Sequence, residues 1–396
     1  MQRGRKQSNI RNFNQSIIVD IIRKRSSSCN EIAKELKMSN STVEYIVDEL
    51  AAIGMLEVDE TSFKKSVGRC PIYYRINKNF GVAVAVDLVN SRFTVCDVDN
   101  NALYEETFVS GGSFLTGHGY KLGDIEIIVG LVKAALARPA FSQLPLRAIV
   151  VATFGKVVIE TGEFTFVSSI DPKINLKKIF TDEFGVAVAV YNDIDLSAIA
   201  EGEYGKLKNE KDNALYVCIN EGCANTLFIN GQIVHGAHYL SGEIGYFVEY
   251  SSFLNQYLSL NKIVTFHRIF NNAVAYSSKN KIKSAITADG NVDDVVEAFK
   301  NGDKLCRSLV LDSGRCLGRA ISGLINVLDC GTFVIAGKVL AFGKEYLSAI
   351  ESELFSHLSH RNSCKLMYSD LTDGVSAGAR IMACDLSIKS HLRKTQ

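Results

Sequence analysis

The first eighty residues alternate between short helical patterns and breaks. Asn14–Arg25 carries isoleucines at positions i, i+1, i+4 and i+5, which predicts an amphipathic helix. A serine run ends it, and a second short helix follows, for which Asn30 is a suitable N-cap. Ser39 then begins a third helix, which ends at Gly54. The residues that this helix turns inward are Val43, Ile46, Val47 and Leu50.

Two strand-like segments follow, Met55–Val58 and Ile72–Ile76, with a polar tip between them. The order helix, helix, turn, helix and two-stranded wing predicts a winged helix-turn-helix. The start of its third helix can offer polar side chains to base edges and backbone N–H groups to phosphates. The predicted DNA contacts are Ser39, Asn40, Ser41, Glu44 and Tyr45 on this helix, and Lys64, Lys65 and Arg69 on the wing.

Two points about this assignment stay open. Asn40 is a candidate reader of adenine, whereas Glu44 either accepts a hydrogen bond from cytosine N4 or repels phosphate and counts against DNA binding. The alternative to a DNA-binding domain is a small helical domain that binds another protein.

The pattern changes after Phe80. Gly81–Asp87 is a continuous apolar run typical of a buried strand, and Phe93–Val98 and Leu103–Val109 read as its hairpin neighbours. Two successive sets of strands followed by helices predict an α/β body in two lobes, with ligands at the carboxyl ends of the strands. The other predicted elements are helix Ile125–Ala137, strand Arg147–Thr153, strand Val186–Tyr191, helix Leu196–Glu203, strand Ala214–Ile219, hairpin Asn225–His235, helix Leu305–Leu328 and strand Thr332–Ala336.

Composition and charge narrow the class of protein. The 396 residues are 47% hydrophobic and 22% charged, which predicts two or three globular domains and excludes disordered and collagen-like chains. Residues 1–80 contain 14 Lys+Arg and 9 Asp+Glu, whereas the remainder contains 30 and 34. A basic head on a mildly acidic body indicates nucleic-acid binding by the N-terminal region.

The ten cysteines are scattered, without a C-x-x-C pair, so we expect reduced and mostly buried thiols in a cytoplasmic protein. Met1–Ser16 has no apolar segment of a signal peptide, and no apolar stretch is long enough to span a membrane. Two histidine pairs, His235 with His238 and His357 with His360, have the spacing of helical zinc ligands. No cysteine or carboxylate pattern completes either site, so we predict no metal.

Several segments together resemble the ROK family of repressors and sugar kinases, in its longer form with an N-terminal winged helix. They are Val67–Pro71, Gly81–Asp87, Asn192-Asp193, Asn230-Gly231, Ser241–Gly245, Gly323–Asp329 and Val334–Gly337. The resemblance covers nearly the whole chain. It implies a winged helix-turn-helix over residues 1–77 and a two-lobed, actin-like (ribonuclease-H-like) sugar-kinase fold over 78–396. Lobe one would span about 78–195 plus the C-terminal helix, and lobe two about 196–375.

The resemblance also implies a ligand site. Asp193 matches the family's catalytic aspartate, and Asn192 and Glu243 match residues that hydrogen-bond sugar hydroxyls. Tyr246 stands where the family usually has a histidine that binds sugar and helps to hold zinc, and the next residues lack the cysteines of the zinc loop. We therefore expect no zinc, and ligand contacts from these four residues and His238. The alternative for Asn192-Asp193 is a cap on the next helix, which Asp193 could be.

Both glycine-rich loops that a ROK kinase uses for ATP phosphates are altered. The first, D-x-G-G-T in the family, reads Asp87–Ser91 and has lost both glycines. The second, G-T-G-x-G-G-G, reads Asn220–Thr226, keeps one glycine and places Glu221 beside the expected triphosphate. Because phosphoryl transfer depends on positioning and charge stabilisation, we predict no kinase activity and no cofactor.

The preferred function is a DNA-binding transcriptional repressor of sugar-metabolism genes. Its kinase-like body would sense a sugar or sugar phosphate, and it would act on a double-stranded operator as a homo-oligomer, a dimer or a tetramer. Ligand would shift the lobes between two arrangements and so change the spacing of paired winged helices. The alternatives are an active ROK sugar kinase with a DNA-binding head and a constitutive DNA-binding protein with a scaffold body.

Overall fold

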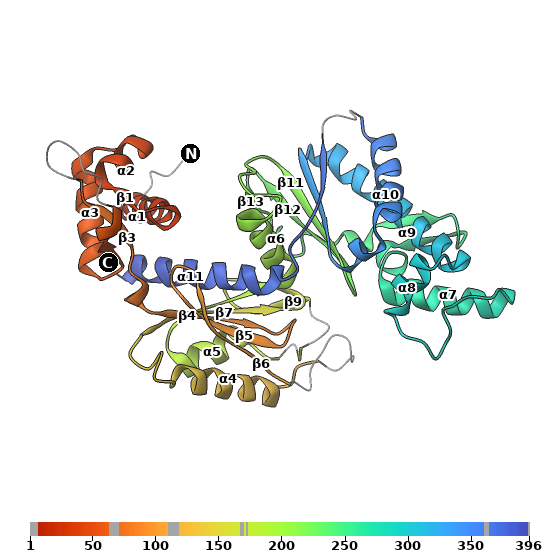
Figure 1. The fold of residues 1–396 in the computed structure, drawn as a ribbon, viewed down its shortest axis with the longest axis horizontal. Helices are drawn as coiled ribbons and strands as arrows, with labels where there is room; N and C mark the ends of the chain where they lie inside the picture. Colours follow the sequence, from red (N-terminus) through yellow and green to blue (C-terminus); the bar gives the residue numbers. More distant parts are fainter. Residues whose placement is uncertain are drawn as a thin grey trace. The chain divides into compact units, whose positions relative to one another are not determined.

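The computed structural model describes residues 7–62, 71–109, 119–166, 170–171, 173–359 and 364–394. The chain forms two compact units. The first comprises Met1–Tyr191 and Ser376–Gln396, and the second comprises Asn192–Val375. The chain therefore crosses between the units twice. Figure 1 shows its elements coloured along the sequence.

The N-terminal part of the first unit contains three helices and a small sheet. Its elements are α1 (Gln7–Lys24), β1 (Ser27–Ser28), α2 (Cys29–Leu36), α3 (Asn40–Ala52), β2 (Leu56–Val58), η1 (Glu60–Ser62) and β3 (Tyr73–Ile76). We call this part the head. Its strands pair antiparallel in the order β1-β3-β2. The predicted pairing of two strand segments is confirmed by β2 and β3. Strand β1 was not predicted, because two residues are too few to show an alternating pattern.

Ser28 caps α2, and the prediction of Asn30 as the cap was wrong. The Ser28 hydroxyl accepts a hydrogen bond from the Glu31 N–H at 3.4 Å, and the Glu31 carboxylate accepts one from the Ser28 N–H at 3.1 Å. This reciprocal capping box satisfies two backbone donors at the start of the helix. The Ser-x-x-Glu spacing in the sequence indicates this capping box. A prediction based on the cap residue type alone does not distinguish Ser28 from Asn30.

The body of the first unit is built on a five-stranded sheet in the order β10-β7-β4-β5-β6. Strand β4 pairs parallel with β7 and antiparallel with β5. All six residues of β4 are buried, because α4 and α5 cover one face of the sheet and α11 covers the other (Figure 1). The elements are η2 (Lys78–Phe80), β4 (Val82–Asp87), β5 (Arg92–Asp97), β6 (Ala102–Thr107), α4 (Leu122–Leu136), β7 (Leu146–Thr153), β8 (Lys156–Val157), β9 (Phe164–Phe166), α5 (Leu176–Phe184), β10 (Ala187–Asn192) and α11 (Gly374–Lys394).

The hydrophobic core of the head includes the end of α11. The four residues of α3 that were predicted to face inward are all buried, as expected. They share one apolar cluster with Ile18 of α1 and with Ile388 and Leu392 of α11. An ion pair between Arg23 of α1 and Asp385 of α11, at 3.2 Å, joins the same two helices.

The second unit repeats the strand order of the first. Its sheet runs β13-β12-β11-β16-β17, with β11 antiparallel to β12 and parallel to β16. In each unit an antiparallel set of three strands is extended by two more strands, which is the two-lobed α/β architecture predicted from the sequence. The elements are α6 (Asp193–Tyr204), β11 (Ala214–Ile219), β12 (Cys223–Ile229), β13 (Gln232–Ile233), η3 (Ile244–Tyr246), β14 (Val248–Ser251), β15 (Gln256–Ser259), η4 (Leu260–Lys262), α7 (Phe266–Asn280), α8 (Asp294–Lys300), α9 (Lys304–Leu328), β16 (Thr332–Ala336), η5 (Lys338–Phe342), α10 (Lys344–His357) and β17 (Lys365–Tyr368).

The predicted hairpin turn at Asn230-Gly231 is confirmed. Both residues have left-handed backbones, with φ of 51° and 69°, as a two-residue hairpin turn requires. The nine cysteines in the described ranges are all free, and all but Cys29 are buried. No helix among the described residues has the length and hydrophobicity needed to cross a membrane.

Candidate functional site

The outer face of α3 carries the predicted DNA-contacting residues. Ser39 caps the helix, as predicted, and its hydroxyl accepts a hydrogen bond from the Thr42 N–H at 3.2 Å. The five predicted positions from Ser39 to Tyr45 are all exposed, and 60% of the Tyr45 surface is accessible. The buried apolar stripe lies on the opposite side of the helix. The polar side chains of the first two helical turns therefore face outward. This is the geometry of a helix that reads a groove.

Asn40 and Glu44 contact each other one turn apart. The Asn40 Nδ2 donates to Glu44 Oε1 at 3.1 Å. The amide therefore holds the carboxylate against the helix surface. Contacts of Asn40 and Glu44 with DNA stay a prediction.

Sequence reasoning missed the links between α3 and α1. Glu49 of α3 pairs with Arg11 and accepts a hydrogen bond from Gln15 at 3.3 Å. A hydrogen bond with Glu49 and the charge of that carboxylate raise the pKa of Tyr45. Arg11 is half-exposed and thus brings a cation to the same side of the head as Tyr45. These partners lie more than thirty residues apart, so no local pattern reveals them.

The predicted wing contacts Lys64, Lys65 and Arg69 lie outside the described residues. Their contacts with DNA stay a prediction. At the base of the wing, Arg75 of β3 donates to Glu57 of β2 at 2.7 Å.

A second polar cluster surrounds the start of α6 in the second unit. Asn192 accepts hydrogen bonds from the Ile194 and Asp195 N–H groups at 3.0 and 3.3 Å, so Asn192, not Asp193, is the helix cap. The Asn192 Nδ2 donates to Asp193 Oδ1 at 2.9 Å. Asn192 is buried, whereas Asp193 is half-buried. Asn192 therefore positions the Asp193 carboxylate at the helix N-terminus, where a negative charge is favourable.

Asp195 connects this helix to the neighbouring strand and loop. Its Oδ1 accepts a hydrogen bond from the Thr226 hydroxyl at 2.7 Å, and its Oδ2 lies 3.6 Å from His235 Nδ1. The His235 ring stacks on Tyr239, with centroids 5.5 Å apart and planes inclined by 18°. Sequence reasoning did not place these four residues in a ligand site. It considered His235 only as a possible zinc ligand with His238, and Asp195 had a signal in its position three residues after the cap.

The loop that carries Glu243 is tied to the same end of the sheet. The Asn225 N–H donates to the Gly242 carbonyl at 2.9 Å, and the Ser241 N–H donates to the His235 carbonyl at 3.1 Å. Burial and the nearby Asp193 charge raise the pKa of Cys218, at the end of β11, to about 12. Burial also raises the pKa of Cys223, at the start of β12, and the Glu243 charge adds to it. Asp193 and Glu243 therefore both approach the turn between β11 and β12.

His238 and Tyr246 lie at the edge of this cluster. His238 is exposed in the loop before Glu243, and Tyr246 is 58% exposed at the end of η3. We call Asn192, Asp193, Asp195, Thr226, His235, Tyr239 and Glu243 the strand-end cluster. Ligand contacts by its members and by these two flanking residues stay a prediction.

In the first altered glycine loop, the residues after Asp87 donate hydrogen bonds to the Asp87 carboxylate. This carboxylate is buried and accepts hydrogen bonds from the Val89 and Asn90 N–H groups at 3.0 and 2.9 Å. The Asn90 amide and the Ser376 hydroxyl bind its other oxygen. The backbone donors of this turn are thus directed at Asp87 instead of at a phosphate.

The second altered loop carries an ion pair. Glu221 lies 3.0 Å from the Lys338 ammonium, and the Asn220 side chain accepts from the Lys338 N–H at 2.9 Å. Gly337, with φ of 96°, precedes this contact, and a Cβ there would lie 2.4 Å from the Ile219 carbonyl oxygen. The chain segments after β11 and β16 therefore approach closely only because residue 337 is glycine.

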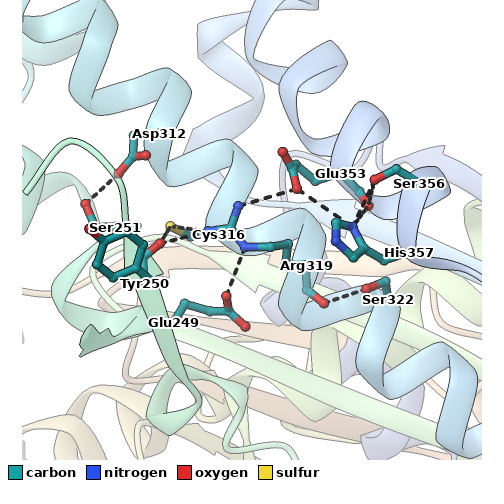
Figure 2. A network of polar contacts seen from close by, with 10 residues as sticks. All are labelled: Glu249, Tyr250, Ser251, Asp312, Cys316, Arg319, Ser322, Glu353, Ser356 and His357. Carbon is teal, nitrogen blue, oxygen red and sulfur yellow. Dashed lines mark hydrogen bonds and ion pairs between the residues drawn. The ribbon is translucent and has the colours of Figure 1, made fainter. Parts of the chain in front are cut away.

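Side chains of the β14–β15 hairpin bind the long helix α9 (Figure 2). Arg319 of α9 pairs with Glu249 of β14 at 3.2 Å and with Glu353 of α10 at 3.4 Å, and it donates to the Tyr250 carbonyl at 2.8 Å. This arginine thus holds the hairpin and both helices together.

The hairpin follows Tyr246, where the sequence resemblance would place a zinc loop, and its side chains do not fit that metal. Residues 247–260 contain no cysteine or histidine. Glu249 is paired with Arg319, and the Ser251 hydroxyl donates to Asp312 at 2.5 Å. A structural zinc site requires four cysteine or histidine ligands in most cases. In the part of the chain that the structure describes, no group of three or more His, Cys, Asp or Glu side chains is arranged to hold a metal.

Comparison with known proteins shows which family the chain belongs to. The sequence profile of the ROK family matches residues 125–252 and 271–383, more than half of the chain. A xylose repressor of Caldicellulosiruptor bescii is 21% identical over 378 residues, covering 90% of this chain and 91% of that protein.

Two solved structures share the fold. One is a ROK family transcriptional regulator, a homologue of the E. coli MLC protein; it has a TM-score of 0.79 at 17% identity and covers 97% of this chain and 98% of its own. A ROK hexokinase from Thermus thermophilus has a TM-score of 0.60 at 17% identity and covers 76% of this chain and 98% of its own. The regulator therefore matches almost the full length, whereas the kinase matches about three quarters of it. By its sequence profile and its fold, the chain belongs to the ROK family.

Proposed function

We propose that this protein is a DNA-binding transcriptional regulator, acting as a repressor on a double-stranded operator. The observation that carries the proposal is the outer face of α3, where a capped helix exposes Asn40, Ser41 and Tyr45 above a buried apolar stripe. The likeness to the xylose repressor over 90% of the chain supports it. An operator with two-fold symmetry requires paired heads, so we propose a homo-oligomer, a dimer or a tetramer, in the cytoplasm.

We further propose that the strand-end cluster binds a sugar or a sugar phosphate. Asp193 and Glu243 would accept hydrogen bonds from adjacent hydroxyls, and Asn192 would orient Asp193. Tyr246 and His238 would contact the ligand from the edge. The name of the xylose repressor makes D-xylose the first sugar to test.

The altered glycine loops support binding without phosphoryl transfer. Asp87 occupies the backbone donors of the first turn, and Glu221 brings a negative charge to the second. A kinase needs both positions to stabilise the charge of the transferred phosphoryl group. The protein would therefore sense the sugar without consuming ATP.

Ligand would control DNA affinity by its preference for one conformation. Asn192 is the first residue of the second unit and the cap of α6, so the Asp193 side chain lies beside one of the two chain crossings. A ligand that binds one conformation of this crossing more tightly shifts the DNA-binding equilibrium by the ratio of its two affinities.

The test uses full-length protein and a DNA fragment that it selects from genomic DNA. Fluorescence anisotropy with D-xylose, D-glucose, N-acetylglucosamine and their phosphates would show a change in DNA affinity of about fivefold or more with at least one of them. Asp193→Asn should lose this response and keep the affinity for DNA. Asp289→Asn, an exposed carboxylate of the same unit, is the matched control and should behave as the wild type.

Two results would contradict parts of the proposal. Sustained ADP formation with ATP, Mg²⁺ and the same sugars, lost in Asp193→Asn, would show an active kinase. A ligand that binds only the folded protein must raise its melting temperature. If none of the sugars or phosphates does so, the body is a scaffold and the head binds DNA constitutively.

A further inference from the structure

Two cysteines from distant parts of the first unit meet beneath α11. Cys96 lies on β5 and Cys384 on α11, and their sulfur atoms are 3.8 Å apart. Both side chains are fully buried. The sulfurs of a disulfide are about 2 Å apart, so a bond between these two requires a movement of only about 2 Å.

Backbone contacts aim the two sulfurs at each other. The Cys384 thiol donates to the Asp97 carbonyl at 3.2 Å, next to Cys96 in the sequence, and the Cys96 thiol lies 3.5 Å from the Ala83 carbonyl. Each sulfur is therefore held at the interface between the sheet and α11. Neither is free to rotate away without losing a buried hydrogen bond.

Two arginines and the Asp97 carboxylate lie close enough to the pair to influence the two thiols. The charge of Arg23 of α1 favours a lower pKa for Cys384. The charge of Arg380, one turn before Cys384 on α11, favours a lower pKa for Cys96. The Arg380 Nε is buried and has no hydrogen-bond partner. The hydrogen bond from Cys96 lowers the pKa of Cys384, and the Arg23 charge adds to this, although burial and Asp97 oppose it. The bond to Cys384 and burial raise the pKa of Cys96, although Arg380 opposes this.

The positive charge of Arg23 favours the thiolate form of Cys384. A positive charge near a cysteine stabilises the thiolate, which is the form that attacks a peroxide. Because both sulfurs are fully buried, a peroxide reaches them only through a local opening of the contact between α11 and β5. Cys384 is the stronger candidate for the attacking thiolate, and Cys96 keeps its proton until the second step.

We propose that Cys384 and Cys96 form a reversible disulfide when the folded protein meets hydrogen peroxide. The Cys384 thiolate attacks one peroxide oxygen, and the O–O bond breaks. The hydroxide that leaves takes up the proton that Cys384 had released and becomes water, which leaves a sulfenic acid on Cys384. The Cys96 sulfur then attacks the Cys384 sulfur, the S–O bond breaks, and the hydroxyl group leaves with the Cys96 proton as a second water. Two thiols lose two electrons, and one peroxide gains them.

The crosslink would act on the DNA-binding head through α11. Asp385, the next residue after Cys384, pairs with Arg23 of the head, and Ile388 and Leu392 belong to the head's apolar core. A disulfide fixes α11 to β5 one residue before this ion pair. Oxidation therefore restrains the helix on which the head is packed.

The test treats reduced full-length protein with hydrogen peroxide, blocks the remaining thiols under denaturing conditions and digests it with trypsin. The expected peptides 93–121 and 381–389 contain one cysteine each. We expect them to appear joined, lighter by two hydrogens than their sum, and to separate after reduction by dithiothreitol. The joined species should form before Cys29 reacts, because burial and the nearby Glu44 and Asp48 raise the pKa of Cys29 to about 11.

Variants and DNA binding complete the test. Cys384→Ser and Cys96→Ser should each abolish the joined peptide, whereas Cys29→Ser, the matched control, should keep it. Oxidised wild-type protein should differ from reduced protein in DNA affinity by about fivefold or more, and oxidised Cys384→Ser should not.

The proposal is overturned if peptides 93–121 and 381–389 stay separate at peroxide doses that oxidise Cys29. It is also overturned if Cys384 ends as a sulfinic acid while Cys96 stays reduced. These readouts come from the wild-type chain, so they hold even if a variant fails to fold. A crosslink that leaves DNA affinity unchanged would contradict the action on the head.

Discussion

The outer face of α3 and the strand-end cluster are both polar, but they are held in different ways. At the start of α3, the side-chain contacts of Ser39 and Asn40 join neighbours in the sequence: Ser39 caps the helix through the Thr42 N–H, and Asn40 binds Glu44. In the strand-end cluster, Asp195 binds Thr226, 31 residues away, and approaches His235. The first surface is exposed, whereas the second is only partly exposed and depends on contacts between segments that are distant in the sequence.

A binding surface can be made of exposed, hydrated side chains or of side chains that buried hydrogen bonds hold in place. Exposed side chains such as Asn40 are hydrated in the free protein and can exchange water for base edges. A buried polar group costs free energy unless its hydrogen bond is made, so Asp195 and Thr226 are held in one geometry. We infer that α3 supplies contacts directly, and that the buried part of the cluster serves to hold Asp193 and Glu243 in place.

The strongest test of this comparison removes the support beneath α3. Leu50 is buried in the head core, and Leu50→Ala should destabilise the head by about 2–5 kcal/mol and abolish DNA binding, because truncation leaves a cavity. Val327→Ala, at an exposed position of α9, is the control and should change neither. Urea unfolding and anisotropy measure both effects. Full DNA affinity in Leu50→Ala would contradict the dependence of the surface on this core.

Asp195→Ala tests the buried cluster in the same way. It leaves the Thr226 hydroxyl without its carboxylate partner, and we expect a loss of about 1–3 kcal/mol in the stability of the second unit. The affinity for DNA should be unchanged. Urea denaturation with Asp289→Ala as the control checks this. If both variants lose the same small amount, the cluster is not a rigid frame.

Two serines of α3 allow the stability of the helix and its contact with DNA to be tested separately. Ser39→Ala removes the helix cap and should lower the stability of the head by about 1 kcal/mol. Ser41→Ala, two residues later and also exposed, removes the contact of Ser41 with the Ser39 hydroxyl but keeps the bond from the Thr42 N–H to Ser39, so it should cost less stability than Ser39→Ala and weaken DNA binding. Thermal unfolding and anisotropy of both variants give the answer. The reverse pattern would mean that Ser41 supports the helix and does not face DNA.

The smallest expected effect concerns pH. The hydrogen bond from the Ser28 backbone lowers the pKa of Glu31, and the Tyr73 hydroxyl and Arg25 add to this, although burial opposes it. A lowered pKa stabilises the folded head above the ordinary pKa of glutamate, and this contribution is lost as the pH falls through the folded-state value.

Glu31→Gln keeps a side chain that can accept in the capping box and removes the titration. The melting temperature of the variant should therefore fall less than that of the wild type between pH 5 and pH 3, a range set by the ordinary pKa of glutamate near 4.3. Circular dichroism melts at several pH values measure this slope. Equal slopes would show that Glu31 contributes nothing to the acid sensitivity of the head.

The sequence predicts the head and the alternation of strands and helices well, because their signals are local. The stripe Val43–Leu50 and the Asn230-Gly231 turn follow from spacing within a few residues. The cap at Ser28 is also a local signal, because its partner Glu31 is three residues away, but it depends on the spacing of the two residues and not on the type of the cap residue alone.

The candidate ligand site is less accessible to sequence reasoning. Asn192, Asp193 and Glu243 come from a family motif, but His235, Tyr239 and Thr226 join the cluster only through strand pairing and loop contacts. The same holds for Lys338, which pairs with Glu221 from 117 residues away. Cys96 and Cys384 are 288 residues apart and meet only because α11 returns to the sheet of the first unit.

The most direct test of the account is a selection of genomic DNA fragments by the purified full-length protein at moderate salt, followed by sequencing. We predict a few strongly retained sites with two-fold symmetry, and their loss in the double variant Asn40→Ala, Ser41→Ala. Non-specific binding depends on phosphate contacts and decreases steeply with salt. Diffuse retention that disappears with salt, and that the double variant shares, would contradict the assignment of α3 as the DNA-reading helix.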